Sequence, residues 1–365
     1  MLRRPTVSVA MVAILVAAIT GCSSVAPTAP TPSLPQADQS IPLADLAILD
    51  DPHSFVGEST AVLEDADIPM VTTIPTPSMP VTVTSHDLDG DVDVTVKSTD
   101  RILAMDLSGS IAATVYGLGL GDSVVGRDIS TTFPAAEDLP VITSSGHTVN
   151  NESILALRPT VLITDGSIGP IDVVLQLRDA GIPVVFVETD PSLQGIEELT
   201  HQVAAALGVE AAGDELSATI AASITDKVSE IASILPEKPL RMIFLYLRGS
   251  SGVYYLFGKE SGADVLITSL GGVDVAAEVG IQGNRPMTDE AFIAANPDLV
   301  LVMTDGIESV GGVDGLLESK PAIALTTAGQ NRRFVDMADG EILSFGPRTP
   351  AVLDALARAI YAPAS

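Results

Sequence analysis

The sequence contains one cysteine and no tryptophan, and aromatic residues make up only 4 % of its 365 positions. With Cys22 as the single thiol, no disulfide can form within the chain, and a zinc site built from several thiolates is excluded. Basic residues are also scarce, since 18 lysines and arginines stand against 47 acidic residues and give a formal net charge of -29. A protein that binds nucleic acid needs a basic face, so nucleic acid is not an expected partner. An anionic ligand would have to be attracted by local arginine or lysine side chains.

Motifs of several enzyme classes are missing as well. The stretch GLGLGD from Gly117 to Asp122 lacks the third glycine of a dinucleotide-binding loop. The sequence has no GxxxxGKS or GxxxxGKT phosphate-binding loop, no GxSxG elbow and no HExxH zinc motif. Hydrolysis by an activated nucleophile or by a bound metal is therefore unsupported.

The N-terminal residues predict export. Arg3 and Arg4 precede an apolar run over residues 7–19, which is typical of a signal peptide covering residues 1–21. The run is too short for a transmembrane helix. The letters ITGC that follow resemble a bacterial lipobox, so we expect Cys22 to be acylated and to anchor the protein to the cell membrane, outside the cytoplasm. A plain secretory signal with a chance cysteine is the alternative interpretation.

The chain after the predicted signal peptide divides into a predicted tether and three further segments. Residues 22–79 are rich in proline, threonine, serine and alanine, and they predict a flexible tether. Residues 80–212 and 237–365 each alternate short apolar strands with helical segments, which is typical of an α/β lobe whose parallel sheet is covered on both faces. Between them, residues 213–236 predict one uninterrupted helix of about 30 Å that joins the lobes.

A weak internal repeat indicates that the two lobes are equivalent. Glu152 opens a predicted helix that Pro159 ends, and the apolar strand that follows turns at Thr-Asp-Gly. Glu290 and Pro297 stand at the same spacing before a second strand that also leads into Thr-Asp-Gly. An acidic residue suits the first turn of a helix because of the helix dipole. The plainer interpretation is that strand–helix units resemble one another.

One predicted strand combines an apolar body with an unusual polar end. Residues 240–249 read LRMIFLYLRG. Because side chains alternate between the two faces of a strand, Tyr246 and Arg248 project from the same face. Taken alone, the pair fits equally well a core tyrosine and an arginine in a surface ion pair.

Three of the four histidines have ordinary explanations. His53 lies in the predicted tether, His86 beside a predicted hairpin turn, and His201 in a predicted helix. His147 differs because it lies in a polar loop just before a helix, and such loops line the cleft of open α/β sheets. A single loop histidine is nevertheless more often simply exposed to solvent.

The order of lobe, helix and lobe resembles the binding proteins that serve ABC importers of siderophores, cobalamin and haem, over about residues 80–363. Three stretches, RILAMDLSGSIAATVYGLGLGDSVVGRD, SSGHTVNNESILALRPTVLI and FLYLRG, are very similar to the haem-binding lipoproteins of bacterial haemin importers, the HmuT type. The resemblance implies a class III substrate-binding fold, with two Rossmann-like lobes joined by a single long helix. It also implies ferric haem as the transported ligand.

The resemblance further implies roles for particular residues. In that family, a histidine of the first lobe and a tyrosine of the second lobe are axial ligands of the haem iron, and an arginine two residues after the tyrosine bonds to it. His147, Tyr246 and Arg248 stand at the matching positions. The wider class docks to an ABC permease, which works with an ATPase, through one glutamate on each lobe, and Glu152 and Glu290 match those positions. Surface proteins that donate haem are further partners that the resemblance allows.

The chemistry of iron agrees with these roles. Ferric iron is a hard cation that favours an anionic oxygen ligand, and tyrosine is a known haem ligand. A phenol with a pKa of about 10 binds metal as phenolate only where that form is favoured, and an arginine on the same strand face supplies a fixed positive charge. Arg127 and Arg348 are expected to pair with haem propionates. Met303 could pack on the porphyrin, although a core methionine is its plainer interpretation.

Three other functions stay open at this point. The same fold could carry a ferric siderophore or cobalamin, neither of which needs an axial histidine–tyrosine pair. A haem-dependent enzyme would need an open axial position and distal acid–base groups, so two axial ligands argue against it and no catalytic residue is predicted. A tethered structural or adhesive protein would leave the cleft residues unexplained.

Overall fold

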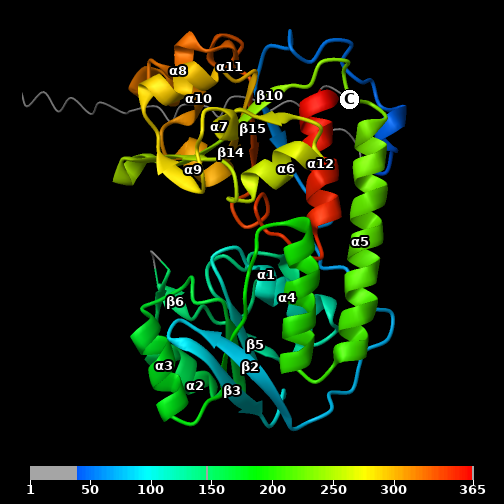
Figure 1. The fold of residues 1–365 in the computed structure, drawn as a ribbon, viewed down its shortest axis with the longest axis vertical. Coiled ribbons are helices and arrows are strands. Elements are labelled where there is room, and N and C mark those ends of the chain that lie inside the picture. Colours follow the sequence, from blue (N-terminus) through cyan, green and yellow to red (C-terminus); the bar gives the residue numbers. More distant parts are fainter. Residues whose placement is uncertain (1–38, 145–146, 364–365) are drawn as a thin grey trace, which may run out of the picture. The chain divides into compact units, whose positions relative to one another are not determined.

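The computed structural model describes residues 39–144 and 147–363, and these residues form two α/β lobes (Figure 1). Cys22, the predicted signal peptide and the first part of the predicted tether lie outside the described residues. Within the part of the chain that the structure describes, no helix is long and apolar enough to cross a membrane.

The first lobe is built on a parallel sheet of four strands in the order β5-β4-β8-β9. The strands are β4 (Ile102–Met105), β5 (Val124–Gly126), β8 (Val161–Thr164) and β9 (Val184–Phe186). Its helices are α1 (Ser110–Gly117), α2 (Asn151–Leu157), α3 (Ile171–Asp179) and α4 (Leu193–Ala206), with the short turns η2 (Gly121–Ser123) and η3 (Pro134–Ala136). Two antiparallel hairpins complete it: β2 (Val81–Asp87) with β3 (Gly90–Val96), and β6 (Thr143–Ser144) with β7 (Thr148–Val149). All residues of β4, β8 and β9 are buried, as expected for strands covered on both faces.

The second lobe is built on a mixed sheet of seven strands in the order β1-β15-β14-β10-β11-β13, with β12 paired to β10. The strands are β1 (Ser59–Ala61), β10 (Arg241–Arg248), β11 (Val253–Phe257), β12 (Val273–Asp274), β13 (Asn284–Pro286), β14 (Leu299–Met303) and β15 (Phe334–Met337). The helices and short turns of this lobe are α6 (Ala263–Ser269), α7 (Val275–Glu278), α8 (Asp289–Ala295), α9 (Thr304–Glu308), α10 (Gly312–Ser319), α11 (Thr327–Gln330), α12 (Thr349–Tyr361), η1 (Leu43–Asp45), η4 (Gly249–Ser251) and η5 (Ile323–Leu325).

The expectation of parallel sheets holds for the first lobe and needs correction in part of the second. Neighbouring strands from β1 through β15 and β14 to β10 are parallel. Strand β11 instead runs antiparallel to both β10 and β13. The reason is the short turn η4 between β10 and β11, because a connection of this length joins only antiparallel strands.

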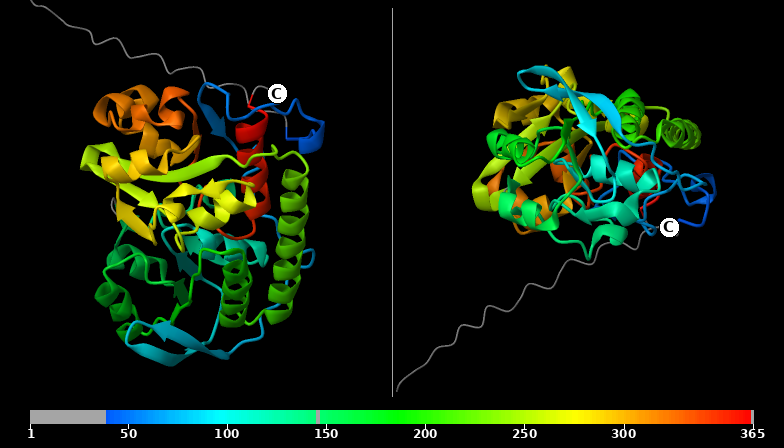
Figure 2. Two further views of the ribbon diagram at one scale, coloured as in Figure 1. Left: turned by 45° about the horizontal axis from the view of Figure 1, so that its top comes forward. Right: turned by 90° about the horizontal axis from the view of Figure 1, so that it is seen from below.

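One long helix, α5 (Glu210–Ala232), connects the lobes and runs alongside both of them (Figures 1 and 2). It begins and ends about one turn earlier than predicted. Near its start it packs tightly on α4, where a Cβ atom on Gly213 would lie 2.5 Å from Cβ of Ala204. Near its end, Nζ of Lys227 lies 2.6 Å from Oδ1 of Asp354 on α12. The helix is therefore attached to each lobe through a different half.

Residues 39–79, which we expected to belong to a flexible tether, pack against both lobes: the earlier part lies on the second lobe, and further on the backbone N–H of Val71 donates to the carbonyl oxygen of Gly117 in the first. Strand β1 pairs with the edge strand β15, and Leu43 is fully buried. Arg333, only 1 % exposed, donates to Oγ of Ser59 at 2.7 Å and to the carbonyl oxygen of Ala359 at 2.9 Å. The prediction of a tether is wrong for these residues, because their scattered apolar side chains are buried only by surfaces far away in the sequence.

The internal repeat is visible in the ends of two equivalent helices. At the start of α2 and α8, the side chains of Asn150 and Thr288 each accept a hydrogen bond from the backbone N–H three residues later. At their ends, Arg158 and Asn296 have φ values of 47° and 38°, directly before the two prolines of the repeat. Such left-handed ends are uncommon at non-glycine residues, so the agreement between the lobes extends beyond a general likeness of strand–helix units.

A buried pair of carboxyl groups lies at the N-terminus of α1. Asp106 and Asp128 are both fully buried, and Oδ2 of Asp128 accepts a hydrogen bond from the backbone N–H of Asp106 at 3.0 Å. Burial, followed by the negative charges of Asp128 and Asp165, raises the pKa of Asp106 to about 7. The folded protein therefore holds a proton at pH values where the unfolded chain has already lost it.

We expect the free energy of unfolding to fall as the pH rises from about 4, where an unfolded aspartate titrates, to about 7. Asp128→Asn removes one charge of the pair, so this fall should be shallower when urea unfolding is measured across the range. The matched control is Asp93→Asn, which removes an exposed charge and reports general repulsion in this acidic protein. Equal slopes in the two variants would contradict the interpretation.

Candidate functional site

One face of the second lobe's sheet carries aromatic and cationic side chains near the end of β10. Tyr246 is directly opposite Tyr255 on β11, and Arg248 is opposite Val253. Directly opposed residues of an antiparallel pair share a face. The ring of Tyr246 stacks on that of Phe257, with the ring centroids 5.8 Å apart and the planes 20° apart. This face of the sheet therefore carries a phenol and a guanidinium, and the phenol ring packs on a second aromatic ring, that of Phe257.

Arg248 lies across the ring of Tyr246. Its guanidinium carbon is 4.6 Å from the ring centroid, which is a cation–π distance. Nη1 donates to the carbonyl oxygen of Leu247 at 2.9 Å, while Nη2 forms an ion pair with Asp339 and lies 3.8 Å from Sδ of Met303. The structure thus places Tyr246, Arg248 and Met303 together, and adds Asp339 to them.

His147, the residue of the first lobe that the sequence predicts at the site, has an unusual backbone. It lies in the turn between β6 and β7, donates its N–H to the carbonyl oxygen of Ser144 at 3.2 Å and has a φ of 59°. Among the described residues, its Nδ1 atom has no hydrogen-bond partner although it is buried. A strained backbone and an unused buried nitrogen are both features that collect at functional sites.

The charge of Arg248 reaches His147 from the other lobe. Burial lowers the pKa of His147, and the positive charge of Arg248 lowers it further. A neutral imidazole is the form that binds metal ions. Burial and the charge of Arg248 therefore both favour the neutral imidazole of His147.

Two arginines expected at the site also make contacts within the protein. Arg127 donates to the carbonyl oxygen of Thr131 at 3.1 Å and holds its own loop together. Arg348 is only 3 % exposed, donates to the carbonyl oxygen of Gly340 at 3.0 Å and lies over the ring of Phe133, 5.6 Å from its centroid. The Nε atoms of both arginines and Nη1 of Arg348 are buried without a hydrogen-bond partner among the described residues. The expectation that these two arginines meet ligand propionates therefore stays a prediction.

The two glutamates of the repeat are exposed. Glu152 lies in the first turn of α2 and Glu290 in the first turn of α8. Each is therefore available on the surface of a different lobe, at the same position of an equivalent helix.

Sequence reasoning missed Phe257 and Asp339. Phe257 belongs to an apolar stretch that predicts an ordinary strand and gives no sign of a binding site. Asp339 follows β15 in an Asp-Gly pair, and loops at the carboxyl ends of parallel strands line the clefts of open sheets. The position of Asp339 just after a predicted parallel strand could therefore have identified it as a candidate site residue.

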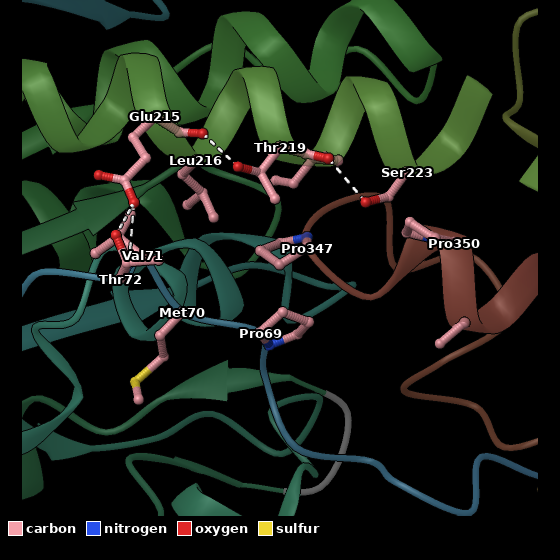
Figure 3. Close-up of a pocket in the computed structure, with 12 residues that line it drawn as sticks. Pro69, Met70, Val71, Thr72, Glu215, Leu216, Thr219, Ser223, Pro347 and Pro350 are labelled. Atoms are coloured by element: carbon pink, nitrogen blue, oxygen red, sulfur yellow. Dashed lines mark hydrogen bonds between the residues drawn. The ribbon is translucent and has the colours of Figure 1, made fainter. Parts of the chain in front are cut away.

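A cavity of about 200 Å³ lies elsewhere, between α5, the segment around Met70 and the start of α12 (Figure 3). Glu215 closes one side of it by accepting a hydrogen bond from Oγ1 of Thr72 at 2.7 Å. The predicted site residues do not line this cavity. Within the described part of the chain, no group of three or more His, Cys, Asp and Glu side chains could hold a metal ion by itself.

Comparison with known proteins identifies the family. The model of the periplasmic binding protein family matches residues 106–339. The chain belongs to this family. Its fold is that of a class III periplasmic binding protein, with two α/β lobes and parallel strands in both.

Solved and curated members of the family are similar over most of the chain. A crystal structure of heme binding protein HmuT is 41 % identical with a TM-score of 0.80, and the match covers 86 % of this chain and 99 % of that one. The periplasmic heme-binding protein RhuT from Roseiflexus sp. RS-1, in its apo form, is 37 % identical with a TM-score of 0.66, covering 73 % and 100 %. The uncharacterized ABC transporter substrate-binding lipoprotein YvrC of Bacillus subtilis (strain 168) is 27 % identical over 285 residues, 77 % of this chain and 86 % of that protein.

The proximity of His147 and Arg248 can be tested without a ligand. Arg248→Ala removes the cation that faces the imidazole, so we expect the pKa of His147 to rise in an NMR titration of its ring protons. Arg285→Ala serves as the control, because Arg285 is exposed and pairs with Leu256 on the opposite face of the same sheet. A His147 titration that responds equally to both changes would refute the proximity.

Proposed function

We propose that this protein captures ferric haem between its two lobes and delivers it to an ABC permease. The observation that carries the proposal is that Arg248 lies across the ring of Tyr246 and is near enough to His147 of the other lobe to lower its pKa. A phenolate and an imidazole are suitable axial ligands for ferric iron, and a neighbouring guanidinium favours the phenolate. Phe257 and Met303 supply apolar surface next to Tyr246, as a porphyrin requires.

The solved relatives support the same three residues. Heme binding protein HmuT has been solved with an arginine, a tyrosine and a histidine each replaced by alanine. The three replaced residues are separated along that chain by the same intervals as His147, Tyr246 and Arg248 are here. This agreement favours equivalent roles in the two proteins.

The protein acts as a carrier in this proposal. Two axial protein ligands leave no open position on the iron, so the bound haem is transported unchanged. The proposed partners are the permease with its ATPase and, upstream, surface proteins that donate haem. The proposed location is the extracytoplasmic side of the cell membrane, through a lipid on Cys22, which agrees with the lipoprotein designation of the relative YvrC.

Titration with haemin tests the ligand. The purified soluble part is expected to bind one haemin, with a saturable Soret change and a tyrosinate-to-iron charge-transfer band. Tyr246→Ala should abolish that band, and His147→Ala should weaken haemin binding. Arg248→Ala should weaken binding about 10- to 100-fold, because Arg248 contacts the proposed iron ligand Tyr246 without binding the iron itself.

The matched control for that titration is Tyr254→Ala. Tyr254 is opposite Leu247, so its phenol lies on the other face of the same strands, and the variant should bind haemin as the unaltered protein does. A spectrum that is the same with and without Tyr246 would exclude the assignment. Saturable binding of a ferric siderophore or cobalamin in place of haemin would favour a different ligand for the same fold.

Docking through the two exposed glutamates predicts a separate loss. Glu152→Ala combined with Glu290→Ala should leave haemin binding unchanged and abolish haem uptake by cells, because the carrier no longer engages the permease. Asp93→Ala combined with Glu237→Ala removes two exposed acids elsewhere and should leave uptake normal. Normal uptake by the first pair of changes would rule out this docking role.

A further inference from the structure

The guanidinium of Arg248 has two competing neighbours. Its Nη2 atom forms an ion pair with Oδ2 of Asp339. Its central carbon lies 4.6 Å from the ring centroid of Tyr246, and no hydrogen bond to the phenol oxygen is formed among the described residues. In this structure the carboxylate, and not the phenol, therefore takes the strongest contact that the guanidinium makes.

Asp339 is itself held from two sides. Its Oδ1 atom accepts a hydrogen bond from the backbone N–H of Asp305 at 3.0 Å, at the start of α9. The next residue, Gly340, lies against the first lobe, where a Cβ atom would be 2.3 Å from Oγ1 of Thr132 and 2.9 Å from the carbonyl oxygen of Ser130. The position of the Asp339 carboxylate beside Arg248 is therefore set by α9 on one side and, through Gly340, by the contact with the first lobe.

Charged groups from several elements lie near Tyr246. Arg248 contributes a positive charge from β10, and this charge lowers the pKa of His147 in the turn between β6 and β7, after the larger effect of burial. Asp339 contributes a negative charge from the loop after β15, with Asp305 beside it on α9. A cation next to a phenol favours the phenolate, and a carboxylate paired with that cation reduces the effect.

We propose that Asp339 is a positioning residue that holds Arg248 across the ring of Tyr246 and offsets its positive charge, which limits how strongly Arg248 stabilises a Tyr246 phenolate bound to ferric iron. The inference rests on the proposed function, because it takes haem as the ligand of Tyr246. Such a limit is useful in a carrier, since a ligand that is bound too tightly is not passed on. The carboxylate thus sets the balance between capture and release.

The ion pair is tested first in the ligand-free protein. Asp339→Asn keeps the size of the side chain and an oxygen that can accept the N–H of Asp305, and it removes the charge. We expect the guanidinium protons of Arg248 to exchange faster with water in this variant, as measured by NMR, because they lose their anionic partner. Unchanged exchange would overturn the claim that Asp339 holds Arg248.

The effect on the ligand is measured with haemin-loaded protein and an excess of apomyoglobin as acceptor. Asp339→Asn should release haemin about fivefold more slowly, as expected for the loss of one partly screened charge pair. The tyrosinate-to-iron charge-transfer band should move to higher energy, because the phenolate now faces an uncompensated cation. Asp339→Glu, which restores the charge, should return both values towards those of the unaltered protein. Glu308→Gln, which removes an exposed charge from the end of α9, is the matched control and should change neither.

Two failures are distinguishable. If the unaltered protein binds haemin with a band that depends on Tyr246, but Asp339→Asn releases haemin at the same rate or faster, the role of Asp339 is refuted and the proposed function stands. If the unaltered protein binds no haemin saturably, the proposed function fails and this inference fails with it.

Discussion

Strand β10 is paired on both sides, and this pairing decides where its polar end points. With parallel β14 on one side and antiparallel β11 on the other, the strand cannot slip by one residue without turning its whole apolar set to the wrong face. Five of its eight residues are fully buried, so that slip would be costly. The face that carries Tyr246 and Arg248 is consequently fixed by the buried apolar residues of the strand, which are residues 242–245 and Leu247.

The site holds one arginine, Arg248, in a protein that is strongly acidic. A net charge of -29 repels anions at long range, so an anionic ligand depends on positive charges at its own binding site. Arg248 supplies such a charge and affects both Tyr246 and His147, although they come from different lobes. The pairing of Arg248 with Asp339 shows that even this charge is partly balanced. The positive charge at the site therefore comes from one arginine, which contacts both the carboxylate of Asp339 and the ring of Tyr246.

The sequence predicted correctly those features that depend on interactions between residues close together in the chain. The alternation of side chains in β10, the helix α5 without an internal breaker, and the capped helices α2 and α8 all depend on residues that are near one another in the chain. Resemblance to a family added the role of His147, which no local pattern distinguishes from an exposed loop histidine. Its positive φ and its buried, unused nitrogen became visible only in the fold.

Long-range contacts account for what the sequence could not provide. Arg348 looked available for a ligand and is buried, because the loop at Gly340 and the ring of Phe133 from the other lobe close over it. The segment before residue 80 looked like a tether, and its strand β1 completes a sheet whose other strands begin far later in the chain. By itself the sequence determined the class of fold, the repeat of two lobes and the shared face of Tyr246 and Arg248. The tertiary structure alone decided which charge meets Arg248, because Asp339 reaches it through a sheet order that no short stretch of sequence encodes.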